Sequence, residues 1–194
     1  MSKSVKDMMN GMVIRSLTGN MNLYKKRLTS LEGCPEYVGS NLWCENNFLV
    51  NLIGAPKTVG GNFSCIQNKL ETLEGAPDKV LGGFYCDNNN LTSLEYCPRV
   101  IITDFICRDN KLETLYGCPK KIGGTFNVNS NKLTNFIGGP EHIEENLFCT
   151  SNRIESLEGF PKYVGGDVHI KYNRNDFTEK EIRAVCHVGG YIYV

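Results

Sequence analysis

Hydrophobic positions return every 21 residues along most of this chain, which is the clearest feature of the sequence. Four apolar columns keep the step: Leu28, Leu49, Leu70, Leu91, Leu112, Leu133 and Ile154; Leu31, Leu52, Leu73, Leu94, Leu115, Phe136 and Leu157; Val38, Val59, Val80, Ile101, Ile122, Ile143 and Val164; and Leu42, Phe63, Phe84, Phe105, Phe126, Leu147 and Val168. Seven prolines, from Pro35 to Pro161, and seven asparagines, from Asn47 to Asn173, also recur every 21 residues. A fixed period in the twenties is typical of a solenoid whose repeats stack on their neighbours. We therefore expect a mainly β solenoid with a parallel sheet of seven 21-residue repeats over residues 28–174.

The residue pattern within one repeat predicts a single short strand followed by a loop. In "GGNFSCIQNKL", residues 60–70, Phe63 and Cys65 alternate with polar residues and point inward. The proline lies outside this strand, in a largely irregular return segment, and the glycine two residues before it suits a turn with positive φ. Tyr96 breaks that glycine column. We expect the asparagine column to be buried at the strand ends, with each amide bonding to backbone groups.

Both ends of the repeat array differ from its middle and are expected to cover it. Residues 1–27 form an N-terminal cap with a degenerate first rung, because Leu17, Met21 and Leu23 lie one period before three apolar columns. Residues 175–194 form a C-terminal cap. Thr178 and Glu181 have the spacing of a capping box and open a predicted helix at about 178–187, with a strand at 191–194. Terminal repeats must shield an apolar end that would otherwise meet water.

The recurring string F-x-C-x-x-N-x-L resembles the L-x-L-x-x-N-x-L core of leucine-rich repeats, and the resemblance covers residues 28 to 174. The short period is most similar to the bacterial type found in secreted effectors. The fuller wording LEGxPxxVGGxFxCxxNxLTSLEG resembles repeat proteins of tailed bacteriophages and giant DNA viruses. These repeats depart from the bacterial effector type in two ways: they contain an extra glycine, and LEGxP replaces LPxLP. The resemblance implies a leucine-rich-repeat-like architecture and protein binding, with no particular partner.

We expect the cysteines to be core residues. Cys44, Cys65, Cys86, Cys107 and Cys149 share one inward column with Val128 and Ile170, and a free cysteine behaves there as a small hydrophobe. Metal binding would need thiolates that converge with CxxC or Cys/His spacing, which the columns lack. We expect reduced thiols, which predicts a cytoplasmic protein, in the host cytoplasm if it is viral.

No feature of the chain predicts catalysis. The sequence holds three histidines, with no nucleophile–base constellation and no phosphate-binding loop, so we expect neither an enzyme nor a cofactor or metal site. The 21 basic and 21 acidic residues balance, so no whole-molecule field favours nucleic acid or a membrane surface. An apolar run long enough to span a bilayer and a secretory signal are also missing from the sequence.

The candidate site is the outward side of the predicted strands. Side chains between two inward positions point outward, and this column reads Trp43, Ser64, Tyr85, Ile106, Asn127, Phe148 and His169. Trp and Tyr are enriched at binding hot spots. We predict partner-binding residues at Trp43, Tyr85, Ile106, Phe148 and His169, bordered by Glu45, Asp87 and Arg108. The competing interpretation is that strand propensity alone favours these aromatics.

These patterns predict a non-catalytic protein that binds a host protein through its strand face and modulates or inhibits it, with a defence factor as one candidate. Two alternatives stay open. One is a structural or self-assembling role as a homo-oligomer. The other is nucleic-acid binding along a basic stripe near the prolines, made of Lys57, Lys79, Arg99, Lys120, Lys121 and Lys162.

Overall fold

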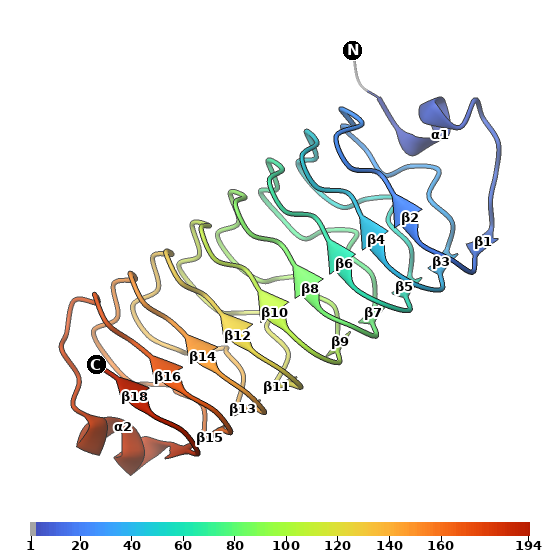
Figure 1. The fold of residues 1–194 in the computed structure, drawn as a ribbon. Helices are drawn as coiled ribbons and strands as arrows, with labels where there is room; N and C mark the ends of the chain where they lie inside the picture. The colour runs from blue at the N-terminus through green and yellow to red at the C-terminus, as the bar shows by residue number, and fades with distance from the viewer. Residues whose placement is uncertain (1–2) are drawn as a thin grey trace.

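The computed structural model describes residues 3–194 and is a parallel β-solenoid with turns of about 21 residues, which confirms the predicted fold class (Figure 1). The even-numbered strands form a nine-stranded sheet, the main sheet, in the order β18-β16-β14-β12-β10-β8-β6-β4-β2. Its strands are β2 (Met21–Asn22), β4 (Leu42–Trp43), β6 (Phe63–Ser64), β8 (Phe84–Tyr85), β10 (Phe105–Ile106), β12 (Phe126–Asn127), β14 (Leu147–Phe148), β16 (Val168–His169) and β18 (Ile192–Tyr193). Every pair is parallel and in register, as in Phe105↔Phe126.

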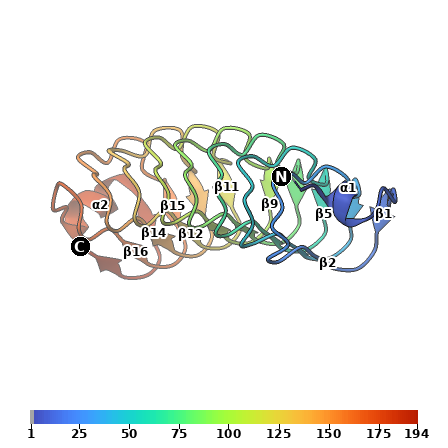
Figure 2. The same cartoon turned by 90° about the horizontal axis from the view of Figure 1, so that it is seen from above.

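Each turn also contains a second two-residue strand, in the part of the return segment that follows the proline. These strands are β1 (Ser16–Leu17), β3 (Tyr37–Val38), β5 (Thr58–Val59), β7 (Lys79–Val80), β9 (Val100–Ile101), β11 (Lys121–Ile122), β13 (His142–Ile143), β15 (Tyr163–Val164) and β17 (His187–Val188). They form a second ladder that runs alongside the main sheet (Figure 2). The prediction of a single strand per repeat was therefore wrong. The rest of the return segment is irregular, as expected.

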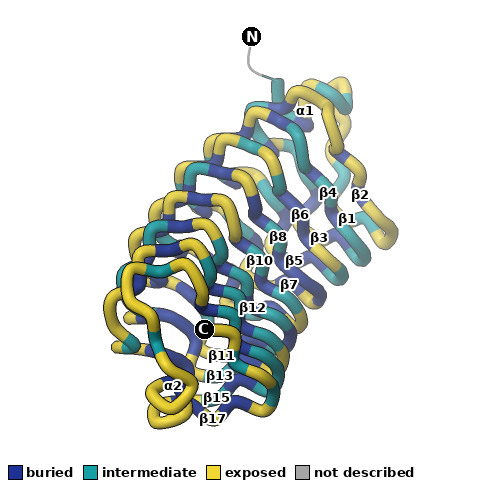
Figure 3. The backbone as a smooth tube through the Cα atoms, turned by 60° about the vertical axis from the view of Figure 1, so that its left-hand side comes forward, coloured by how far each residue is buried: buried dark blue, intermediate teal, exposed yellow. Residues whose placement is uncertain are grey.

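The core is a continuous stack of the predicted apolar columns, and Figure 3 shows the buried stretches recurring from turn to turn. Phe63, Phe84, Phe105 and Phe126 are at most 1% exposed. Their ring centroids follow one another at 5.5, 5.6 and 5.5 Å. In-register pairing places each ring directly against its counterpart in the next turn, so every turn buries its apolar residues only by stacking.

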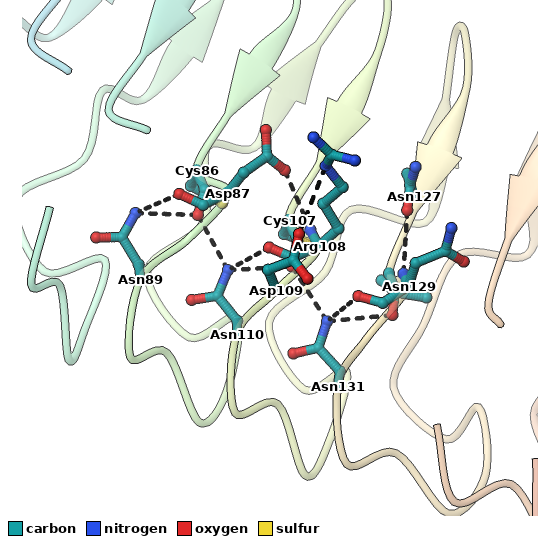
Figure 4. A network of polar contacts seen from close by, with 11 residues as sticks. Cys86, Asp87, Asn89, Cys107, Arg108, Asp109, Asn110, Asn127, Asn129 and Asn131 are labelled. Atoms are coloured by element: carbon teal, nitrogen blue, oxygen red, sulfur yellow. Dashed lines mark hydrogen bonds and ion pairs between the residues drawn. The ribbon is translucent and has the colours of Figure 1, made fainter. Parts of the chain in front are cut away.

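The asparagine column joins each turn to the one before it, as the sequence predicted (Figure 4). Asn110 Nδ2 donates to the carbonyl of Cys86 in the preceding turn at 3.0 Å and to that of Cys107 in its own turn at 3.1 Å. Its Oδ1 accepts the backbone N–H of Leu91 at 3.0 Å. The same pattern recurs from Asn47 to Asn173. The residue before each asparagine has a positive φ, which turns the chain out of the strand.

Short helices stand at both ends. The first, α1 (Val5–Met8), follows the N-cap Ser4 and inserts the fully buried Val5 into the core. The second, α2 (Glu179–Val185), is the predicted C-terminal helix. It starts with the Thr178/Glu181 capping box and buries Ile182. The rungs β1–β2 and β17–β18 lie next to these helices, outside the seven full repeats.

The second ladder is interrupted between β9 and β11, whereas the main sheet continues past this point. Three irregularities meet there. Tyr96 stands in the glycine column with φ 66. Ile102 and Thr103 replace the glycine pair before β10. Arg99 and Lys120 are like charges in a column that elsewhere alternates, as in the Lys57–Glu36 and Lys162–Glu141 ion pairs. A tyrosine adopts a positive φ at some cost where the other turns have glycine, so backbone strain coincides with the interruption of the ladder.

Candidate functional site

The outward side chains of the main sheet form one straight row, here called the strand face. Parallel in-register pairing aligns Trp43 with Ser64, Ser64 with Tyr85, Tyr85 with Ile106, and Phe148 with His169. Trp43, Tyr85, Ile106, Phe148 and His169 are all half-buried rather than fully exposed. Each side chain is covered on two sides by its neighbours about 4.8 Å away, so the row presents side-chain edges to solvent.

The C-terminal part of the strand face is an aromatic stack. The centroids of Phe148 and His169 are 4.5 Å apart, and those of His169 and Tyr193 are 4.3 Å apart with the planes within 14°. Burial between the two rings lowers the pKa of His169. Tyr193 extends the row by one rung beyond the predicted residues. The changed spacing of the last turn hides it in the sequence, since Val168 pairs with Ile192, 24 residues on.

The N-terminal part holds the chain's only tryptophan and a tyrosine on either side of a small residue. Ser64 lies between Trp43 and Tyr85, is 5% exposed, and its Oγ is a buried polar atom without a hydrogen-bond partner. The ring of Tyr85 lies over Gly83, where a Cβ would meet the tyrosine hydroxyl at 2.5 Å. Its hydroxyl donates to Asp104 Oδ2 at 3.4 Å, and burial beside that carboxylate raises the pKa of Tyr85.

The predicted polar border of Glu45, Asp87 and Arg108 follows one column beside this row. Glu45 is half-buried and Arg108 is exposed. Asp87, by contrast, is buried, with only 5% of it accessible. Its Oδ1 accepts the backbone N–H of Arg108 at 3.2 Å, as Figure 4 shows. Burial raises the pKa of Asp87 to about 6, against the opposing effect of the Arg108 guanidinium.

On the opposite border of the row, an Asn/Asp column bonds to the backbone of the next turn, a role that the sequence alone did not predict. Asn41 Oδ1 accepts the backbone N–H of Asn62 at 2.8 Å, and Asn62 Oδ1 accepts that of Gly83 at the same distance. Asp104 and Asn146 repeat the contact on Thr125 and Asp167. The signal in the sequence is an Asn/Asp column at the 21-residue period.

The basic stripe near the prolines is partly ion-paired. Lys121 Nζ lies 2.7 Å from Glu144, and Lys162 Nζ lies 2.9 Å from Glu141. Lys57 Nζ is 3.9 Å from Glu36, and Lys120 donates to the carbonyl of Gly139. Three of the six cations of the stripe therefore have a carboxylate partner.

The nine cysteines are free thiols, and eight of them are buried. Burial raises the pKa of the half-buried Cys34 to about 12 and that of Cys44, Cys65 and Cys86 well above its ordinary value. Within residues 3–194, no group of three or more His, Cys, Asp or Glu side chains is placed to hold a metal ion. None of the helices in that same range is long and apolar enough to cross a membrane.

Comparison with known proteins adds no further guide to function. No protein-family model, no curated protein and no solved structure matches this chain. What the structure shows is a parallel β-solenoid, and the resemblance to leucine-rich repeats rests on the repeated sequence motif. The strand face remains the surface on which most of the predicted residues gather.

Proposed function

We propose that this protein is a non-catalytic, leucine-rich-repeat-like binding module that recognises another protein through its strand face. The resemblance of its repeats to those of phage and giant-virus proteins supports a further step, in which a viral product binds and modulates a host protein. A host defence factor is the partner class that we favour. This step rests on the repeat motif alone.

The observation that carries the proposal is the composition of the strand face. Its outward column is free to hold small polar residues, as it does at Ser64 and Asn127. It holds large side chains at its other positions, Trp43, Tyr85, Ile106 and Phe148, and a histidine at His169. Aromatic side chains supply rigid contact area at low entropic cost, and a contiguous apolar patch on a surface marks an interaction site. The solenoid core beneath the row is fully packed and holds it rigidly.

The competing interpretations have weaker support. Nucleic acid as the partner would rely on the basic stripe, in which three of six cations have a carboxylate partner. Self-assembly through the strand face would bring two similar aromatic rows together, and it has no additional contact in its favour. It is the second candidate, and light scattering tests it directly, since a monomer at micromolar concentration excludes it.

A paired pull-down from host-cell lysate tests the proposal. The bait is the tagged wild type beside the triple variant Trp43→Ala, Tyr85→Ala, Phe148→Ala. The control triple variant, Phe48→Ala, Tyr37→Ala, Tyr116→Ala, removes three exposed aromatics from other faces. Circular dichroism and thermal melting establish equal folding before the comparison.

We expect one protein to be retained by the wild type and the control variant and lost by the strand-face variant. Equal retention by all three baits would refute the strand face as the binding surface. The retained protein, identified by mass spectrometry, then names the partner.

A further inference from the structure

The two halves of the strand face differ in charge. Beside the aromatic row over β4, β6, β8 and β10 lie four carboxylates and one cation: Glu45, Asp87, Asp104, Asp109 and Arg108. The single cation is already engaged, because Arg108 Nε lies 3.7 Å from Asp109 Oδ2. Next to β14 and β16 the row is bordered by Thr150, Asn146, Glu145 and one opposite pair, Asp167 and Lys171. The N-terminal half is therefore the more acidic of the two.

Asp87 is the most unusual member of the acidic half. It is 5% exposed, with Ile66 and Arg108 at the equivalent positions of the two adjoining turns and Tyr85 two residues before it. Its one strong contact is the backbone N–H of Arg108, while the carboxylate of Asp109 lies nearby and repels it. A buried carboxylate beside an apolar surface is unfavourable unless a cation compensates it. A second cation placed over this region would supply the missing compensation.

The aromatic row offers a place for the stem of such a cation. Trp43 and Tyr85 stand two rungs apart, so their backbones are separated by about 10 Å with only Ser64 between them. Ser64 is only 5% exposed, so a side chain bound here packs over the outer edges of the two rings rather than against the serine. Lys and Arg side chains combine an aliphatic stem, which packs on aromatic rings, with a charged head that seeks carboxylates and the faces of Trp and Tyr.

We infer that the acidic half of the strand face binds a basic segment of the partner protein, packing the stem of a Lys or Arg side chain over the outer edges of Trp43 and Tyr85 and placing its charge near Glu45 and Asp104. The inference rests on the proposed function and narrows its partner to a protein with a Lys- or Arg-bearing apolar segment. Arg108 stays paired with Asp109 at the far end of the same surface. Lys25 lies at the near edge, where its ammonium sits over the ring of Tyr24 at 5.0 Å.

The single tryptophan makes this site directly observable. The probes are three capped peptides of about twelve residues in which Leu alternates with Lys, Glu or Gln, titrated into the whole protein while Trp43 emission is recorded. We expect saturable binding of the Lys peptide, at least about tenfold tighter than that of the Gln peptide, and no saturation with the Glu peptide. The affinity for the Lys peptide should fall steeply between about 0.05 M and 0.5 M salt.

Matched variants separate this site from general charge effects. Glu45→Gln with Asp104→Asn should weaken Lys-peptide binding about tenfold, whereas Glu155→Gln with Asp176→Asn, an acidic pair away from the main sheet, should leave it unchanged. Affinity should also rise as the pH increases through about 6, since a bound cation favours ionised Asp87, and Asp87→Asn should remove this rise.

The outcomes distinguish this inference from the proposed function. If the Gln and Lys peptides bind equally, or if the two double variants behave alike, the acidic site is overturned while protein binding by the strand face stands. If no peptide changes Trp43 emission, the inference is overturned, and the pull-down with the triple variant decides separately whether the strand face binds a protein at all.

Discussion

Replacing Asn110 by alanine tests the contact that joins successive turns. The side-chain amide donates to the carbonyls of Cys86 and Cys107 and accepts the backbone N–H of Leu91, and Asn110 is 9% exposed. Alanine leaves the Leu91 N–H without a partner and removes a donor from two buried carbonyls. An unsatisfied buried group costs about 1–3 kcal/mol, and because carbonyls keep a second lone pair, we expect about 3 kcal/mol for the variant.

The loss is measured as the shift of the urea midpoint, followed by far-UV circular dichroism. Asn127→Ala is the control, because Asn127 is half-buried on the strand face and its Oδ1 accepts only the backbone N–H of Asn129 within its own turn. We expect the control to cost less than about 1 kcal/mol. If Asn110→Ala and Asn127→Ala shift the midpoint equally, the amide bridge does not hold the turns together.

Asn110→Asp adds a pH signature to the same test. The carboxylate keeps the acceptor for the Leu91 N–H but faces two carbonyl oxygens, which raises its pKa in the folded state above the unfolded value of about 4. The destabilisation should therefore be smallest below about pH 4 and should grow as the pH rises toward neutrality. A penalty independent of pH would contradict this account.

Four other perturbations examine the core, the strained junction, the buried carboxylate and the thiols. Phe105→Ala should cost about 3–5 kcal/mol by urea unfolding, against less than about 1.5 kcal/mol for the outward Ile106→Ala, and equal costs would refute the inward assignment. Tyr96→Gly should stabilise by about 1 kcal/mol by relieving the positive φ of 66, and a lower melting temperature would show that the tyrosine is not strained. The wild type should lose up to about 3 kcal/mol between pH 4 and pH 7 because the pKa of Asp87 is raised to about 6, and Asp87→Asn should abolish that loss. In the native protein a disulfide reagent should react slowly with all nine thiols, with Cys34 first, whereas urea should make all nine react at once; rapid native reaction of Cys65 or Cys86 would contradict their burial.

The core could be predicted from the sequence because translation along the solenoid gives equivalent residues equivalent surroundings. Phe105 is buried because Phe84 and Phe126 occupy the same position in the adjoining turns, and a single period therefore assigns the whole column. The burial of the asparagine column and its contacts with the backbone could be predicted for the same reason. The break in the glycine column at Tyr96 was also visible, and the interrupted ladder lies in the following strands.

The missed features depend on differences between turns rather than on the period. The outward column of the second ladder changes from Tyr37 through Lys79 to His142, so it shows no strand pattern. The strand face could be identified residue by residue, but its half-burial arises from stacking between unlike neighbours. The burial of Asp87 likewise comes from Arg108 and Ile66, which the composition of a column does not reveal.

The asparagine amides all reach in one direction along the chain. The backbone N–H of Leu28 is bonded by Asn47, and that of Leu112 by Asn131, each 19 residues further on. During synthesis, which delivers the chain from its N-terminus, a turn that has left the ribosome still lacks the amide that completes it. Each turn becomes stable only when the next one emerges, so we expect folding to follow translation one turn behind. If the ribosome pauses, the last turn to emerge would therefore lack its asparagine contacts, however many turns before it are already complete.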